Sequence, residues 1–400
     1  MENVSERLYY VDQYIKEFNC NVVEVTKKDD KYEVVLDKTA FFPGGGGQSC
    51  DLGTVDNINV IDVYEKDDKI IHVLDKEPTN LSNIKGKIDY NRRLDGMQQH
   101  LGQHVLSGCF YSLFGANTAG IHLGETISTI DIIGNITEDM IRKAEKRANE
   151  VIIENHKVNF KITNRKEAKK MGLRRELATS DQTIRVVEIE GLDINACCGV
   201  HPSCTIELQM IKLKGYEKHK GNTRIQFLAG QRAVNDYLKR DLLFENLCNE
   251  LSAGEEEVFK SINNLQENIK NLRDDNNRVK AELSKYLIDS LLSSAIMKGN
   301  TKIINKIFEK EDTKYLSKLT NSLTEEDNVV VLFASVNNNK VNLIFGCSKN
   351  LDNLNMGSIL KDTISLLDGN GGGSKFIAQG GGKNNGNLEN AIKYAINLIG

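Results

Sequence analysis

Two short patterns of metal-binding residues, about a hundred positions apart, carry the clearest chemistry in this 400-residue chain. The first is His100-Leu-Gly-Gln-His104, and the second is Cys197-Cys-Gly-Val-His201. Residues 96–114 show helical periodicity, which places positions i and i+4 on one face of a helix. The second pattern contains a glycine and is typical of a loop. Three imidazole nitrogens and one thiolate suit tetrahedral Zn²⁺, so we predict zinc bound by His100, His104, Cys197 and His201.

Both patterns also have an ordinary structural interpretation. Histidines on an amphipathic helix are usually core or solvated residues, and neighbouring cysteines in a reducing compartment usually pack as small apolar side chains. The helix already has an apolar face formed by Leu101, Val105, Leu106 and Phe110, so it does not need two histidines for packing. This favours the metal site over the structural interpretation.

Further motifs resemble a known family. The segment Thr39-Ala-Phe-Phe-Pro-Gly-Gly-Gly-Gly-Gln48 resembles the glycine-rich motif that opens the editing region of alanyl-tRNA synthetases and of their free-standing AlaX relatives. The two zinc half-sites follow in that family's order, and the segment 371–382 resembles the C-terminal domain of the synthetases. The resemblance covers nearly the whole chain and indicates the long AlaX type, an editing module with a C-terminal domain. Val200 stands where the family usually has a hydroxyl residue.

The resemblance implies a hydrolase that removes serine or glycine wrongly attached to alanine tRNA and spares correctly charged alanine tRNA. Ester hydrolysis needs an activated water and a stabilised oxyanion, and zinc with a single thiolate ligand keeps a positive charge for this purpose. Four protein ligands are nevertheless typical of structural zinc, so a catalytic and a substrate-positioning role for the metal both remain open.

Polar and glycine residues of the first motif are the candidates for substrate recognition. We assign Thr39 and Gln48 to recognition of the serine hydroxyl or to positioning of water. The glycine run is expected to let the backbone approach the substrate closely. Its members are Gly44, Gly45, Gly46 and Gly47.

Three other functions were weighed. A non-catalytic tRNA-binding protein with a structural zinc is the first alternative, because it would use the same metal ligands. An aminoacylating synthetase is disfavoured, because the β-rich region begins almost at Met1 and leaves no room before it for an ATP-binding domain. A phosphoesterase is suggested only by the C-terminal segment, and the Asp-His-His metal motif of that group is absent from the sequence.

Composition limits the location and the partners. A net charge of −4 argues against indiscriminate nucleic-acid binding, although a tRNA enzyme needs only a local basic surface. The eight cysteines form no regular framework and predict reduced thiols. Neither a signal peptide nor a membrane-spanning stretch is visible, so we expect a cytoplasmic protein that does not contact membranes.

The order of predicted elements indicates an α+β protein of four parts. Residues 1–89 read as a short helix near 5–18 followed by strands of a barrel-like domain that carries the glycine loop. Residues 90–230 form an α+β editing domain with the zinc site, including a strand near 204–212. Residues 231–296 are helical, with a break near 252–254, and residues 297–400 form a C-terminal α/β domain.

The helical part carries a heptad pattern. Apolar residues alternate at spacings of four and three from Val258 to Tyr286, with Asn276 at one of the a positions. A dimeric coiled coil and an antiparallel hairpin with the preceding helix both fit this pattern. A homodimer is therefore predicted, and the sequence leaves the choice between the two arrangements open.

The C-terminal domain is the predicted contact for the tRNA body. Residues 297–400 contain 12 lysines against 10 acidic residues. Its glycines fit either a turn-rich connection or a phosphate-binding backbone in which Lys375 and Lys383 face RNA phosphates. The family resemblance favours RNA binding.

Overall fold

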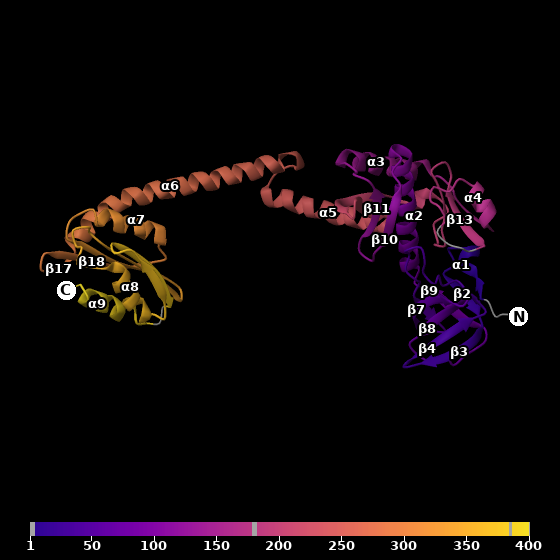
Figure 1. Ribbon diagram of the computed structural model, residues 1–400, viewed down its shortest axis with the longest axis horizontal. Coiled ribbons are helices and arrows are strands. Elements are labelled where there is room, and N and C mark those ends of the chain that lie inside the picture. The colour runs from indigo at the N-terminus through magenta and orange to yellow at the C-terminus, as the bar shows by residue number, and fades with distance from the viewer. Residues whose placement is uncertain (1–4, 178–181, 384–385, 400) are drawn as a thin grey trace. The chain divides into compact units, whose positions relative to one another are not determined.

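The computed structural model describes residues 5–177, 182–383 and 386–399, in two compact units, Met1–Glu250 and Leu251–Gly400 (Figure 1). It is a mixed α/β protein with several sheets. Within the described residues, none of the helices combines the length and the apolar composition that a membrane-spanning helix requires.

A seven-stranded sheet forms the N-terminal part of the first unit. Its strand order is β2-β9-β6-β7-β8-β4-β3. The strands are β2 (Glu17–Cys20), β3 (Val22–Lys28), β4 (Lys31–Leu36), β6 (Gly53–Val55), β7 (Ile58–Lys66), β8 (Lys69–Leu74) and β9 (Ile84–Ile88). One face of this sheet buries Leu36, Ile70 and Leu74 in a cluster with Phe41, which lies in the loop after Thr39. The predicted β-rich domain is therefore present.

Two details of the N-terminal prediction are wrong. The sheet is not a closed barrel, because in the described chain β2 pairs only with β9 and β3 only with β4. Asn21 is the single residue that connects β2 to β3 along the chain. Its backbone N–H and its side-chain amide both donate to the Asp37 carboxylate. The helix expected near residues 5–18 shrinks to α1 (Leu8–Val11), because strand β1 (Glu6–Arg7) precedes it and pairs with β5 (Lys38–Thr39).

Helix α2 (Tyr90–Phe114) is the central element of the next part (Figure 1). The Asp89 side chain caps its first turn by accepting from the Arg92 N–H, and Gly115 ends it in the left-handed conformation. Gly102 lets the helix lie against strand β16, since a Cβ there would come within 2.6 Å of the Ala229 Cβ. Apolar side chains from Leu101 to Phe110 fill the core that α2 shares with its neighbours.

Two antiparallel sheets surround this helix. The first contains β10 (Thr118–Leu123), β11 (Ser128–Ile133), β16 (Asn222–Ala229) and β15 (Ile211–His219) in that order, with α3 (Glu138–Glu154) packed nearby. The second contains β12 (Val158–Asn164), β13 (Thr183–Ile189) and β14 (Asp193–Ala196), with α4 (Arg165–Lys170). The strand expected near residues 204–212 is wrong in its first half, where η1 (Thr205–Leu208) forms a 3-10 turn.

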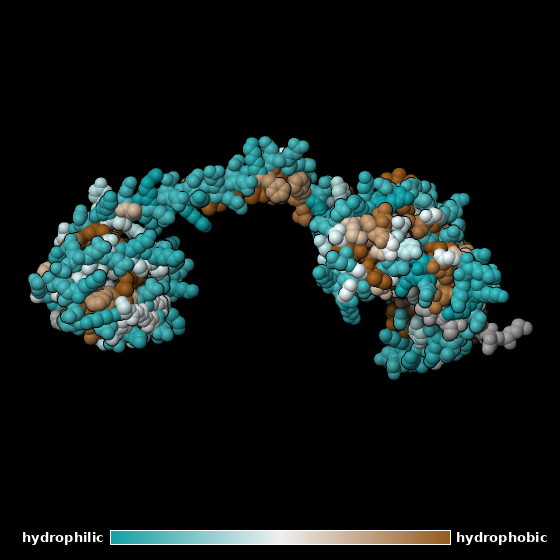
Figure 2. All heavy atoms as spheres, turned by 45° about the horizontal axis from the view of Figure 1, so that its top comes forward, coloured by the Kyte–Doolittle hydropathy of each residue, from teal (hydrophilic) through white to brown (hydrophobic). Residues whose placement is uncertain are grey.

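Two helices form the predicted helical stretch. They are α5 (Gly230–Leu251) and α6 (Val258–Ser293), separated by the expected break and a short 3-10 turn, η2 (Glu255–Glu257). Most of the heptad residues of α6 are exposed; Leu272 and Leu283 keep 68% and 58% of their surface accessible. Figure 2 shows apolar side chains at the surface of this helical stretch. The long helix is therefore confirmed, and the coiled coil stays a prediction.

The second unit ends in a six-stranded sheet with the order β17-β18-β19-β20-β22-β21. Its strands are β17 (Ile296–Lys298), β18 (Thr301–Glu309), β19 (Val329–Asn337), β20 (Lys340–Cys347), β21 (Asn370–Gly373) and β22 (Ile377–Lys383), and its helices are α7 (Thr313–Leu323), α8 (Met356–Ser365) and α9 (Leu388–Asn397). The glycine-rich segment is thus a pair of strands. A Cβ on Gly371 would lie 2.5 Å from the Gly380 Cα and 2.7 Å from Leu360 of α8, so close packing requires glycine.

Candidate metal centre

Four potential metal ligands come together where α2 meets the loop after β14. His100 and His104 lie one turn apart on α2, and Cys197 and His201 belong to the loop. Their ligand atoms all lie within 4.8 Å of one another. The Cys197 Sγ lies 3.4 Å from His100 Nε2 and 3.7 Å from His201 Nε2. The two sequence patterns therefore converge on one point.

Hydrogen bonds determine which nitrogen of His100 faces the centre. Gln48 Oε1 accepts from the Val200 N–H at 3.0 Å, which identifies this atom as the amide oxygen. The same oxygen lies 3.1 Å from His100 Nδ1, so Nδ1 must carry the proton and donate it. The Nε2 lone pair of His100 is therefore free to bind a metal.

Asp193 of β14 orients His104 in the same way. Its Oδ2 lies 3.0 Å from His104 Nδ1, and its Oδ1 accepts from Arg174 Nε at 2.6 Å and from Asn195 Nδ2 at 2.8 Å. Burial raises the pKa of Asp193, but its bonds to His104 and Arg174 outweigh burial and leave the pKa below its usual value. A carboxylate behind a histidine ligand is the usual support of a metal site.

The pKa shifts of Cys197 and His201 favour the ligating state at pH 7, whereas that of His104 opposes it. Burial raises the pKa of the Cys197 thiol, but the neighbouring His100 and His201 outweigh it and hold the pKa well below its ordinary value. Burial lowers the pKa of His201 to about 3, so its imidazole is neutral at pH 7. Burial also lowers the pKa of His104, but the bond to Asp193 raises it to about 9 overall.

Two buried nitrogens of the potential ligands lack a hydrogen-bond partner in the described chain. His201 Nδ1 and His104 Nε2 make no hydrogen bond to any described residue, and His104 Nε2 is the ring nitrogen that is not bonded to Asp193. A buried nitrogen without a partner is costly unless something else binds it. Together with a thiolate and two further imidazoles, His104 Nε2 fits a divalent metal ion.

Glycine backbone brings the loops close to His100. A Cβ on Gly199 would lie 2.2 Å from the His100 Cε1, so only glycine fits there. In the glycine-rich loop, Gly46 has a φ of +60° and its Cβ would lie 3.2 Å from the same atom. Gly45 approaches the Cys198 Sγ, and Gly44 and Gly47 also have positive φ. The loop expected to approach a substrate thus lies against the metal ligands.

Arg185 of β13 holds the Cys197 loop from its other side. Its Nη1 donates to the carbonyl oxygens of Cys197 at 3.0 Å and Gly199 at 2.8 Å. Its guanidinium carbon lies 4.6 Å from the Tyr10 ring centroid and 4.7 Å from that of Phe160. Sequence reasoning missed Arg185, Asp193 and Arg174, because no local spacing links these residues to the ligands.

The structure gives the two predicted recognition residues different environments. Gln48 contacts His100, as described above. Thr39 is fully buried, and its Oγ1 lies 2.8 Å from His72 Nε2 and accepts from the Phe41 N–H. His72 Nδ1 lies 3.2 Å from the Val34 carbonyl, so Nδ1 carries the proton and the Thr39 hydroxyl donates to Nε2. Recognition of a substrate by Thr39 stays a prediction.

The lysines of the C-terminal segment are not brought together. Lys375 lies in the turn before β22, and Lys383 ends that strand, so about 20 Å of extended chain separates them. Strand β22 pairs with β20 on one side and with β21 on the other, so its backbone amides serve the sheet. Contact of these glycines and of both lysines with RNA phosphates stays a prediction.

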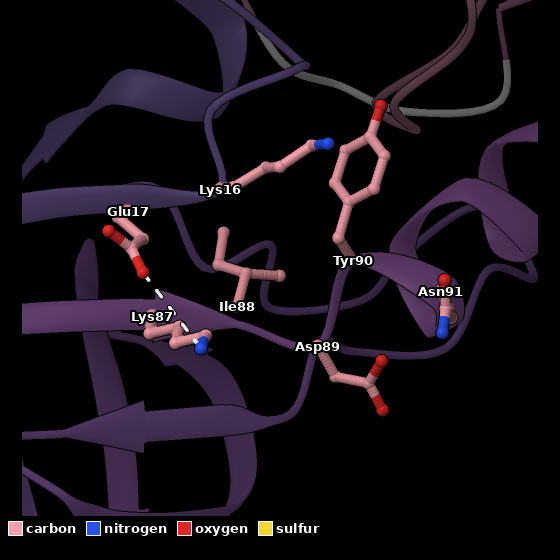
Figure 3. Close-up of a pocket in the computed structure, with 7 residues that line it drawn as sticks. All are labelled: Lys16, Glu17, Lys87, Ile88, Asp89, Tyr90 and Asn91. Atoms are coloured by element: carbon pink, nitrogen blue, oxygen red, sulfur yellow. Dashed lines mark ion pairs between the residues drawn. The ribbon is translucent and has the colours of Figure 1, made fainter.

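Two hollows open on the first unit. One, of about 290 Å³, is partly lined by Gln48 and therefore adjoins the metal centre. The other, of about 520 Å³, lies at the start of α2, where Lys16 Nζ is 4.3 Å from the Tyr90 ring centroid and Lys87 pairs with Glu17 (Figure 3). Its lining includes no described residue that contacts the four potential metal ligands, whereas Gln48 of the smaller hollow contacts His100, so the smaller hollow is the candidate substrate cavity.

Comparison with known proteins gives the family. The chain is 30% identical to the alanyl-tRNA editing protein AlaX-L of Pyrococcus horikoshii, over 94% of each chain. It belongs to the alanyl-tRNA editing protein family. It is also 30% identical to the alanyl-tRNA editing protein Aarsd1 of Mus musculus, over 92% of each chain. An alanine–tRNA ligase of Methanobrevibacter smithii is 28% identical over 99% of this chain, which spans 46% of the ligase.

Two domain families match parts of this editing-family chain. Residues 184–226 match the threonyl and alanyl tRNA synthetase second additional domain, which includes the Cys197 loop and Arg185. Residues 300–400 match the DHHA1 domain, which covers the six-stranded sheet from β18 onward. The family resemblance predicted from the sequence motifs is confirmed.

Proposed function

We propose that the chain is a hydrolase that acts in trans on alanine tRNA mischarged with serine or glycine and leaves Ala-tRNA(Ala) intact. The observation that carries the proposal is the buried cluster of one thiolate and three imidazoles beside a polar cavity. The names of the relatives, which are alanyl-tRNA editing proteins, support the substrate class.

We propose zinc as the metal, held by His100, His104, Cys197 and His201. Bound there, zinc would supply a positive charge that stabilises the developing oxyanion or polarises a water. The chain prepares this position in advance: Gln48 and Asp193 direct the two helix imidazoles, and Arg185 holds the loop. A preorganised set of groups loses little energy to rearrangement during the reaction.

Gln48 is the proposed reader of the serine side chain. Its Oε1 is occupied by His100 and Val200, whereas its Nε2 has no acceptor among the described residues and lies beside Gly96 at the cavity. This amide N–H can donate to a serine hydroxyl, whereas alanine and glycine would each leave it unpaired, so this contact distinguishes serine from both. Sites that hydrogen-bond a substrate hydroxyl reject the analogue without it by roughly 10⁴–10⁵-fold.

A substrate panel tests this proposal. Full-length protein is mixed with Ser-, Gly- and Ala-tRNA(Ala) without ATP, and loss of the ester is followed in single turnover. We expect rapid hydrolysis of the serine ester and little of the alanine ester. Equal rates on serine and alanine esters would exclude the recognition role of Gln48.

A binding protein with a structural zinc is the second candidate, because four protein ligands are the usual pattern of structural sites. It would retain zinc and bind tRNA(Ala) without hydrolysing any of the three esters.

We further propose that exposed Lys375 and Lys383 contact tRNA phosphates at separate points, and that two chains associate through the exposed heptad residues of α6.

A further inference from the structure

The cavity beside Gln48 has an unusual charge distribution. It measures about 290 Å³ and lies along one side of α2, reaching the start of α5. Its charged lining residues are Asp51, Arg92, Asp95, Glu125 and Arg232. All of them belong to the first unit, Met1–Glu250.

Two of the three carboxylates are already neutralised. Asp51 is buried and paired with Arg93, which binds both of its oxygens. Asp95 is paired with Arg232, whose Nε lies 3.0 Å from the Asp95 Oδ1. Arg232 also donates to the Gly124 carbonyl at 2.7 Å, which ties the wall of the cavity together. These pairs contribute no net charge to a ligand.

Arg92 and Glu125 remain available. Arg92 Nε donates to the Cys50 carbonyl at 3.0 Å, but its two Nη groups have no acceptor among the described residues. Glu125 is exposed and makes no hydrogen bond or ion pair within the described chain. The cavity therefore offers one guanidinium edge and one carboxylate to a ligand, and Gln48 is part of the same lining.

This pair of groups matches one end of an RNA chain. A guanidinium edge binds phosphate through two parallel hydrogen bonds, and a carboxylate accepts from ribose hydroxyls. A 3′-terminal nucleotide carries a phosphate on its 5′ side and, beside the ester, one free ribose hydroxyl. The volume is at the small end of ligand cavities, which suits one sugar and its phosphate but not a helical stem.

We propose that this cavity binds the 3′-terminal nucleotide of the acylated RNA, with Arg92 on its 5′-phosphate and Glu125 on the free ribose hydroxyl. The proposal rests on the proposed function, because it takes the ester-bearing end of tRNA as the ligand. Gln48 contributes to both the cavity and the metal centre, so a ribose held here presents its ester toward the metal ligands.

Binding of uncharged RNA tests the cavity without hydrolysis. The probes are an acceptor-stem hairpin ending in CCA, the same hairpin without its last nucleotide, and one ending in a 2′,3′-dideoxynucleotide. Fluorescence anisotropy gives the affinity of the full-length protein for each. We expect the terminal nucleotide to raise wild-type affinity about tenfold, and Arg92→Gln to abolish this gain while the truncated hairpin binds as before.

The variants separate the two contacts. Glu125→Ala should bind the CCA hairpin and the dideoxy hairpin with equal affinity. It should keep part of the gain in affinity that the terminal nucleotide provides. Arg92→Lys keeps the charge without the paired N–H groups and retains part of the gain if Arg92→Gln folds poorly. Arg142→Gln on exposed α3 is the matched control and keeps the full gain. Persistence of the gain in both Arg92→Gln and Glu125→Ala overturns the proposal.

Failure of the proposed function gives a different result. If no ester is hydrolysed but the terminal-nucleotide gain is present and is lost in Arg92→Gln, the cavity assignment stands and the hydrolase assignment falls. If serine esters are hydrolysed but both variants keep the gain and the wild-type KM, the cavity assignment alone is wrong.

Discussion

At the residue scale, each of the two helix imidazoles of the centre is directed by a neighbour outside the ligand set. Gln48 accepts from His100 Nδ1 and Asp193 from His104 Nδ1, so each histidine turns its Nε2 toward the centre. The sequence revealed the ligands because an i, i+4 pair and a short loop pattern are local. It could not reveal Asp193, Arg174 or Arg185, because their approach depends on how β13 and β14 pack against α2.

Asp193→Asn should weaken zinc binding without removing a ligand. The amide can no longer accept a charge-assisted hydrogen bond from His104, and loss of such a partner typically costs 10–100-fold in metal affinity. Competition with a chromophoric chelator measures the affinity. The matched control is Asp131→Asn, which breaks the partly buried pair with Arg224 and should leave zinc affinity unchanged. Equal affinities for Asp193→Asn and wild type would argue against this support.

Zinc affinity should rise with pH between about 6.5 and 9. In the metal-free protein the pKa of His104 is raised to about 9, so below that pH Nε2 carries a proton that zinc must displace. Because the pKa values of Cys197 and His201 are lowered, these two ligands release no proton when zinc binds. Release of the His104 proton should therefore change the zinc affinity about tenfold per pH unit below pH 9, and the affinity should level off above pH 9. A pH-independent affinity, or release of two protons, would contradict this assignment.

At the element scale, the long helices and the apolar strands were predictable, and the glycine-rich strands β21 and β22 were not. Periodicity located α3, α6 and α9 because their apolar faces are continuous in sequence. The segment 371–382 suggested a loop or phosphate-binding backbone, since glycine is unfavourable in strands. Close packing of β21 and β22 against each other and α8 overrides that preference. Likewise, strand β1, which pairs with β5, occupies the start of the expected N-terminal helix.

The Thr39 hydroxyl connects two strands, because it lies in β5 and bonds His72 of β8. Thr39→Val should lower the free energy of unfolding by about 1–3 kcal/mol, since it leaves the buried Nε2 of His72 without a donor. Urea unfolding measures the change. Thr26→Val, on exposed β3 of the same sheet, should alter stability by less than about 0.5 kcal/mol. A Thr39→Val protein with wild-type stability but a reduced serine-to-alanine rate ratio would instead support the recognition role.

At the scale of the whole molecule, the chain divides after Glu250 into a unit that carries all the proposed chemistry and a unit that ends in the glycine-rich sheet. The four-part division predicted from the sequence stays a prediction. Within the first unit, Arg232 at the start of α5 pairs with Asp95 of α2, so this ion pair crosses the predicted boundary at residue 230. The heptads of α6 remain exposed and available for a second chain.

Sedimentation tests the proposed dimer. Leu272→Glu places a charge in the exposed seam and should convert the full-length dimer to a monomer, because a buried unpaired carboxylate at the interface is costly. Ala281→Glu lies on α6 outside the seam and should leave the dimer intact. A wild-type chain that sediments as a monomer would contradict the dimer and favour the hairpin with α5.

The most direct measurement is hydrolysis of Ser-tRNA(Ala) as a function of zinc occupancy. Metal-stripped full-length protein is titrated with zinc, and the ester-hydrolysis rate and bound zinc are measured on the same samples. We expect activity to rise in proportion to zinc and to saturate at one ion per chain, with Cys197→Ala losing both and Cys198→Ala keeping both. Full hydrolysis without zinc, or one zinc per chain without hydrolysis, would contradict a zinc-dependent editing hydrolase.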